Sequence, residues 1–180
     1  ERNERWPELI DALKQRCGAP VLSLQRRADM VRIAEVQEKH TDQIDAAIET
    51  WFSIREEFGE DGEVVERLDG LMSTAGRFVD LAKLLEGAAR HERARASRLL
   101  THLGDVYREK LGEHERPLDW YEKALAVNPI DTGARSGAEA LLELDGCRSR
   151  AAAALARAYE ESGDWQRTLQ LLEHRLEATD

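Results

Sequence analysis

The chain has 180 residues, of which 34% are charged and 42% hydrophobic, and its net charge is −10. This length fits one domain or one stretch of a repeat array, and the composition fits a chain that buries a core. The acidic charge repels a phosphate backbone, which argues against a nucleic-acid partner, and no window of about 18 apolar residues predicts a membrane span.

Good helix formers dominate, and strand-favouring residues never alternate with a period of two, so we expect only helices. In chain order the predicted helices span residues 6–17, 20–41, 43–58, 62–75, 77–90, 93–111, 114–127, 131–144, 148–162 and 165–178. The predicted stops between them are Gly18, Gly59, Gly76, Gly112, Pro129, Gly146 and Gly163. Short connections make consecutive helices antiparallel neighbours, and no linker divides residues 1–180, so we expect one domain.

The start of the chain and its composition suggest its origin. It begins Glu1-Arg2-Asn3, without an initiator Met or an apolar signal region, so we expect a segment of a longer protein. Cys17 and Cys147 lie far apart in no metal or redox spacing, which predicts buried free thiols and a cytoplasmic location. Arginine outnumbers lysine 21 to 5, which is typical of a GC-rich bacterial genome.

The sequence repeats itself. With an offset of 70 residues, Met30 aligns with Leu100, Ile33 with Leu103 and Trp51 with Tyr121. With offsets of 72 and 87 residues, Trp6 aligns with Phe78, and Phe78 with Trp165. The matches recur at helical spacing, so one helix-pair unit recurs along the chain.

One copy, residues 97–130, carries a family pattern. Its residues are Leu103-Gly104-Asp105-Val106-Tyr107, Gly112, Trp120-Tyr121-Glu122-Lys123-Ala124-Leu125 and Asn128-Pro129. They resemble a tetratricopeptide repeat (TPR), with Pro117 in place of a small residue and one extra residue in the turn. Ala156, Tyr159, Gly163, Trp165 and Leu172 resemble a second copy, and residues 27–60 and 62–90 resemble weaker ones. The degenerate pattern is similar to that of long bacterial repeat arrays.

The resemblance implies an all-α solenoid of antiparallel helix pairs, about ten helices in a right-handed superhelix, whose first helices line a concave groove. On these copies the groove residues are Glu35, Glu38, Arg98, Asp105, Arg108, Arg150, Arg157 and Glu160. Their mixed charges favour a polar peptide or protein as the partner. The predicted helix 131–144 is not followed by a typical second helix, so we expect the array to be irregular there.

No pattern predicts catalysis. The five histidines form no i, i+4 pair and no Glu-x-x-His, and neither a Gly-rich phosphate loop nor Cys-x-x-Cys occurs. His102, near Asp105 in helical spacing, is interpreted as a polar surface or groove histidine, with a general base as the alternative. We therefore expect no enzyme activity, no metal and no cofactor.

The aromatic residues are interpreted mainly as packing residues. The equivalent positions of Trp6, Phe78 and Trp165 predict contacts between helices rather than a ligand cage. Tyr107 and Tyr121 are predicted to be buried, and Trp120 is predicted either to pack or to contact a partner.

Two charge clusters have alternative interpretations. An acidic turn at residues 56–66 forms either a solvated loop or a docking site for a basic partner. Arginines between residues 90 and 98 form either a solvated helix end or a site for an anion.

The sequence as a whole predicts a non-catalytic scaffold that holds a protein or peptide. The alternative is a regulatory or accessory helical domain fused to an enzyme elsewhere in the parent chain. Isolated solenoids need polar caps, so apolar residues on the first and last helices predict a homo-oligomer formed through open ends.

Overall fold

The computed structural model describes residues 5–20, 22–113 and 115–177, and this part of the chain is built of helices without a strand. Its ten α-helices are α1 (Trp6–Gly18), α2 (Ser23–Lys39), α3 (Ile44–Phe58), α4 (Gly62–Ala75), α5 (Phe78–His91), α6 (Ala96–Asp105), α7 (Arg116–Val127), α8 (Thr132–Ala140), α9 (Asp145–Ser162) and α10 (Trp165–Glu177). The predicted all-α fold is confirmed.

Most helix ends follow the predicted signals. Gly76 and Gly163 take the left-handed conformation that ends a helix, and the Asp131 side chain caps α8 by accepting a hydrogen bond from the Ala134 N–H at 3.0 Å. The predicted stop at Gly146 is wrong. That glycine lies in the first turn of α9, and α8 ends earlier, at Ala140.

The predicted helix 93–111 is broken into three parts. A 3₁₀ turn, η1 (Arg93–Arg95), precedes α6, and a π-helical turn, η2 (Val106–Lys110), follows it. The Leu111 N–H donates to the Val106 carbonyl five residues earlier, at 3.1 Å. A wider turn of this kind accommodates one additional residue, which is what this copy has relative to the family pattern.

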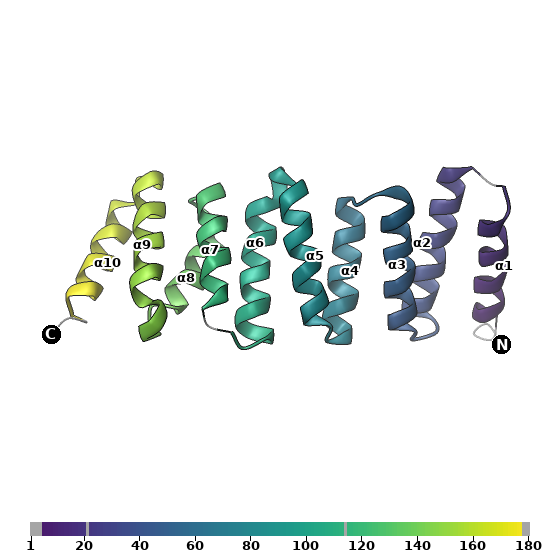
Figure 1. Ribbon diagram of the computed structural model, residues 1–180, viewed down its shortest axis with the longest axis horizontal. Coiled ribbons are helices and arrows are strands. Elements are labelled where there is room, and N and C mark those ends of the chain that lie inside the picture. Colours follow the sequence, from purple (N-terminus) through teal and green to yellow (C-terminus); the bar gives the residue numbers. More distant parts are fainter. Residues whose placement is uncertain (1–4, 21, 114, 178–180) are drawn as a thin grey trace. The chain divides into compact units, whose positions relative to one another are not determined.

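The chain divides into two compact units, residues 1–81 and 82–180. In the first unit, α2 packs on α1 and α3, and α3 packs on α4, with consecutive helices antiparallel (Figure 1). Trp51 and Ile54 of α3 are fully buried, and Ile33 and Val36 of α2 form a small core with Ile10 and Leu13 of α1.

A buried carboxylate also links α1 to α2. Asp29 of α2, only 2% exposed, accepts a hydrogen bond from Arg16 Nε at 2.6 Å and a second from the same guanidinium, and Gln25 donates a third at 2.8 Å. The hydrogen bonds from Arg16 lower the pKa of Asp29. The buried charge is therefore paired and hydrogen-bonded, as burial of a carboxylate requires.

The lowered pKa of Asp29 predicts a pH-dependent contribution to stability. Because the carboxylate is favoured in the folded state, its contribution is complete above the unfolded pKa of about 3.9 and is lost as the pH falls through the lower folded pKa. Asp29→Asn should therefore destabilise the protein at about pH 7 and have a smaller effect near about pH 3. Urea unfolding at both pH values tests this, and a pH-independent difference would contradict it.

The second unit is built around Tyr121 of α7, which is fully buried as predicted. Helix α7 packs on α6, α8 and α9, and α8 packs on α6. Two glycines leave room for the ring, because a Cβ atom on Gly104 of α6 would lie 2.5 Å from Tyr121 Cε1, and one on Gly137 of α8 would lie 2.3 Å from Tyr121 Cζ. The tyrosine thus determines how closely three helices approach.

Gly137 provides a test of this close approach. Replacing a glycine inside a helix with alanine usually stabilises by about 1 kcal/mol, but Gly137→Ala should destabilise by about 1–3 kcal/mol because the methyl group overlaps a buried ring. Gly70→Ala in α4 is the matched control, since a Cβ atom there meets no atom within 4 Å and the change should stabilise. Chemical denaturation of both variants measures the difference in sign.

Tyr107 and Trp120 differ from Tyr121. Tyr107 is half-buried, so its predicted burial is wrong. Its ring is nearly parallel to that of Trp120 at a centroid distance of 6.3 Å, and the Arg116 guanidinium lies over it at 5.7 Å. Trp120 is also half-buried, with Lys123 Nζ 3.9 Å from its ring centroid. Its side chain packs against the core, as one of the two predicted alternatives had it.

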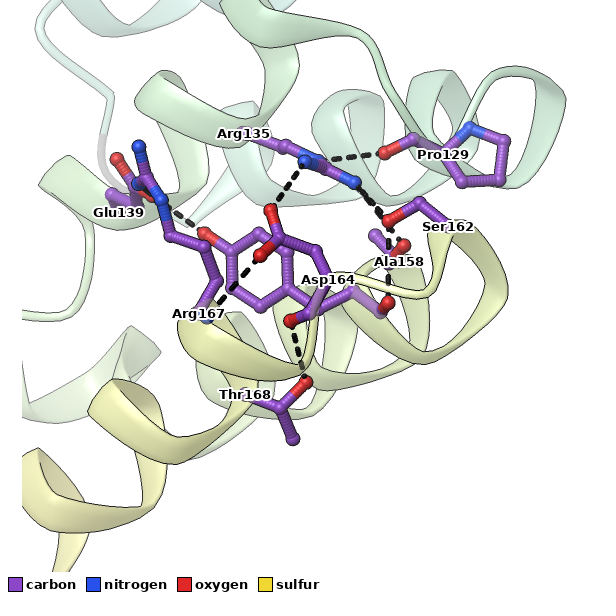
Figure 2. A network of polar contacts seen from close by, with 9 residues as sticks. Pro129, Arg135, Glu139, Ala158, Ser162, Asp164, Arg167 and Thr168 are labelled. Carbon is purple, nitrogen blue, oxygen red and sulfur yellow. Dashed lines mark hydrogen bonds and ion pairs between the residues drawn. The ribbon is translucent and has the colours of Figure 1, made fainter.

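Arg135 of α8 joins this irregular helix to the pair α9–α10 (Figure 2). Its guanidinium donates to the Pro129 carbonyl at 2.7 Å, to the Ala158 carbonyl at 3.3 Å and to Ser162 Oγ at 2.5 Å. It also lies 3.5 Å from Asp164 Oδ2 and over the ring of Tyr159. One side chain thereby satisfies main-chain carbonyls at the end of α9 and in the turn before α8.

Candidate interaction surfaces

In the first unit, the two predicted groove residues lie on α2. Glu35 is half-buried and forms ion pairs with Arg32 at 3.3 Å and with Arg67 of α4 at 3.9 Å. Glu38 lies one turn further along α2 and is also half-buried. Glu35 therefore contributes to the contact between the two first helices α2 and α4, while part of its side chain stays accessible.

In the second unit, Arg98, Asp105 and Arg108 lie on α6 and η2 but play different parts. Arg98 is exposed and makes no hydrogen bond or ion pair with another described residue. Asp105 Oδ1 accepts a hydrogen bond from the Tyr121 hydroxyl at 2.7 Å, and Arg108 Nε donates to the same hydroxyl at 3.2 Å. Arg98 is thus a free surface position, whereas Arg108 is held by the side chain of Tyr121.

The hydroxyl of Tyr121 stays protonated in this arrangement. Burial raises its pKa, and so does the hydrogen bond that it donates to Asp105. The neutral hydroxyl of Tyr121 donates to Asp105 and accepts from Arg108, and it thereby orients both side chains. These two residues therefore present a fixed pair of opposite charges at the surface of α6.

The remaining predicted residues, Arg150, Arg157 and Glu160, lie on α9. Arg150 bridges to Asp119 at 2.7 Å and to Glu122 at 2.8 Å, both on α7. The hydrogen bonds that Arg150 donates to these two carboxylates raise its pKa. Arg157 and Glu160 are exposed, and Arg157 donates a hydrogen bond to the Ala153 carbonyl of its own helix, at 3.4 Å.

The lone helix α8 separates the two groups of predicted residues in the second unit. Helix α8 packs beside α6, whereas α9 packs beside α7, and α6 and α9 do not pack on each other within the described residues. The structure therefore brings Asp105 and Arg108 together, but it does not bring them to Arg150, Arg157 or Glu160. Arg157 instead lines a hollow of about 230 Å³ between α7 and α9, with Lys123, Ala154 and Glu161 among its other residues.

A tyrosine on α9 has surroundings like those of Tyr121. The Tyr159 hydroxyl donates to Glu139 at 2.5 Å, and Arg167 of α10 donates to the same carboxylate at 2.8 Å (Figure 2). Burial and the hydrogen bond to Glu139 raise the pKa of Tyr159 to about 12. The tyrosine–carboxylate–arginine arrangement thus occurs twice in the second unit and holds helices together in both places.

Apolar side chains are exposed on the last helix. Trp165 is 67% and Leu169 is 61% exposed, four residues apart on α10. The prediction that Trp165 packs between helices is therefore wrong, because no described helix covers this side of α10. Its equivalents Trp6 and Phe78 are half-buried, and Trp6 stacks on His40 at a centroid distance of 3.8 Å.

Between residues 5 and 177, leaving out 21 and 114, no three His, Cys, Asp or Glu side chains are grouped to hold a metal ion. Over the same residues, no helix combines the length and apolar character needed to cross a membrane. Cys147 is buried, and Cys17 is half-buried with a pKa raised by burial.

The arrangement of the helices is that of a helical-repeat protein built of antiparallel helix pairs. The sequence model of the tetratricopeptide repeat matches residues 151–180, which include α10 and all but the first six residues of α9. No curated protein matches the chain.

Among solved structures, the crystal structure of MamA is similar over 88% of this chain and 89% of its own, with 18% identity and a TM-score of 0.57. A tetratricopeptide repeat protein from Parabacteroides merdae ATCC 43184 is similar over 92% of this chain and 70% of its own, with 15% identity and a TM-score of 0.57. The chain therefore has a TPR-like helical-repeat fold.

Proposed function

We propose that the chain is a non-catalytic scaffold that binds a protein or peptide through the charged face of its first helices. A TPR-like fold supports a protein-interaction role in general, because stacked helix pairs offer extended surfaces. The observation that carries the finer proposal is the set of accessible charged groups on α6 and η2 of the second unit, namely Arg98, Asp105 and Arg108; Glu35 and Glu38 form a separate charged group on α2 of the first unit.

The charges of this face suit a polar partner. Asp105 and Arg108 lie 3.5 Å apart and are held by Tyr121, so they present one group of each sign in a fixed geometry. Arg98 adds an unpaired cation on the same helix. Mixed signs at short range give only a moderate dependence of binding on salt, unlike contacts with a nucleic acid.

Arg98→Glu tests this face. The side chain is exposed, so the change should alter stability by less than about 0.5 kcal/mol, yet it should reduce the recovery of a partner from the lysate of the source organism. Lys110→Glu is the matched control, because Lys110 is also exposed and lies outside the predicted set. Equal recovery by both variants, with equal melting temperatures, would exclude Arg98 from the binding face.

The homo-oligomer is a further part of the proposal. Exposed Trp165 and Leu169 on α10 support contacts between copies of the chain, since exposed apolar patches mark interaction sites. Light scattering at high protein concentration should then show species larger than a monomer, and Trp165→Gln should reduce them. A strictly monomeric wild type would contradict this.

A further inference from the structure

A groove between α1 and α3 lies outside the predicted face. Both helices pack on α2, but within the described residues they do not pack on each other. An open cavity of about 410 Å³ occupies the space between them. Its lining residues are Lys14, Cys17 and Gly18 of α1, Arg26, Met30 and Ile33 of α2, and Glu49, Thr50, Ser53 and Glu57 of α3.

The floor of this groove is apolar. Met30 and Ile33 of α2 and Cys17 of α1 lie along it, and Met30 and Cys17 are only half-buried. Methionine is unbranched and flexible, so it adapts to different apolar side chains. An apolar floor that stays partly accessible is the usual feature of a surface that receives a helix.

The walls and one end of the groove are polar. Lys14 stands on the α1 wall and Glu49 on the α3 wall, where its carboxylate, 70% exposed, lies 3.6 Å from Arg77. At one end of the groove, Arg26 of α2 and Glu57 of α3 form an ion pair of 3.1 Å. One wall is therefore basic and the other acidic, so a helix between them is favoured with acidic residues toward α1 and basic residues toward α3.

The shape of the groove favours a helix over a compact ligand. Arg26, Met30 and Ile33 are spaced i, i+4 and i+7, so the floor follows one stripe along the axis of α2. Ridges on an incoming helix pack into a groove of this direction at small crossing angles. The cavity lies in the size range of about 300–1,000 Å³ that is common for ligand pockets, which is enough for a few apolar side chains.

We propose that this groove docks an amphipathic helix of a partner protein, with apolar side chains at i, i+3 or i+4 and i+7 against Met30 and Ile33. The first helix α2 forms the floor of this groove, but neither Glu35, Glu38 nor any residue of α6 lines it, so the groove differs in its residues from the site of the proposed function.

The test is a selection of peptides from a phage-displayed library of about 16 residues, long enough for marginal helices. The full 180-residue chain is the target, and the dissociation constants of enriched peptides are measured by fluorescence polarisation. Ser53→Trp places a large side chain in the groove mouth, and its matched control is Ser149→Trp, an equally exposed serine on α9. Thermal melting of both variants confirms that they are folded.

We expect enriched peptides with the helical apolar spacing and with acidic and basic residues on opposite flanks. Ser53→Trp should raise their dissociation constants at least about tenfold, and Ser149→Trp and Arg98→Glu should leave them unchanged. Saturating peptide should also slow alkylation of Cys17 by N-ethylmaleimide about tenfold or more, because that thiol lies in the groove.

Three results would overturn the inference. They are a selection without enriched peptides, enriched peptides without helical spacing, and peptides whose binding neither is weakened by Ser53→Trp nor slows the alkylation of Cys17. Peptides or partners sensitive only to Arg98→Glu would support the proposed function and reject the groove. The failures of the two proposals are therefore distinguishable.

Discussion

Tyr121→Ala should lower the free energy of unfolding by roughly 3–5 kcal/mol, since truncating a fully buried aromatic residue leaves a cavity among three helices. Tyr121→Phe should cost only about 0.5–1.5 kcal/mol. The hydroxyl is lost there, but Asp105 and Arg108 remain 3.5 Å apart and accessible to water. Urea unfolding of both variants separates the contribution of the ring from that of the hydroxyl.

The same cavity predicts a coupling. In the Tyr121→Ala background, the methyl group of Gly137→Ala has no ring to overlap, so the second change should become neutral or stabilising. Additive effects of the two substitutions would show that the ring does not determine the approach of α8. An unchanged melting temperature in Tyr121→Ala itself would mean that the repeat alignment is wrong.

The sequence predicts Tyr121 well because its environment is local and periodic. The offset of 70 residues aligns it with Trp51, and both side chains are fully buried between helices. A large side chain that recurs beside a small one on the neighbouring helix is the repeating unit of the core, and this pattern needs only helical spacing to be recognised.

Trp165 shows where the same reasoning fails. Its alignment with Phe78 identifies the position in the repeat correctly, but burial depends on a neighbouring helix that the pattern does not specify. Tyr107 fails for a different reason. The π-helical turn η2 begins at Val106 and changes the direction in which the following side chains point, and only a small departure in loop length marks it in the sequence.

The groove residues depend on packing order, which the sequence describes incompletely. The sequence places Arg150 and Arg157 on the first-helix face because α9 matches a first helix of the repeat. The irregularity predicted at residues 131–144 has the consequence that α9 packs beside α7, so a correct repeat assignment does not place these side chains next to Asp105. Because α8 has no second helix, α9 and α10 are shifted by one helix in the packing order of the repeats.

No sequence pattern predicts the contacts of Arg135. Two of its hydrogen-bond partners are main-chain carbonyls, and any residue type supplies a carbonyl. Those partners, Pro129 and Ala158, lie 6 residues before it and 23 residues after it. The arginine is only 15% exposed, and its planar guanidinium has enough donors to reach all of them (Figure 2). This contact compensates for the missing second helix after α8.

Arg135→Met should therefore destabilise the protein by about 3 kcal/mol. The apolar stem of the side chain is kept, but the Pro129 and Ala158 carbonyls and Ser162 lose a charged donor, and hydrogen bonds to charged groups contribute about 1.5–3 kcal/mol each without adding fully.

The expected loss is local as well as global. Hydrogen exchange should speed up first in α10 and at the end of α9, where the guanidinium holds the turn around Asp164. Arg157→Met is the matched control, since that arginine is exposed on α9 and bonds only within its own helix, so its effect should stay within about 0.5 kcal/mol. If the two variants unfolded at the same urea concentration with the same exchange pattern, Arg135 would not be what joins α8 to the pair α9–α10.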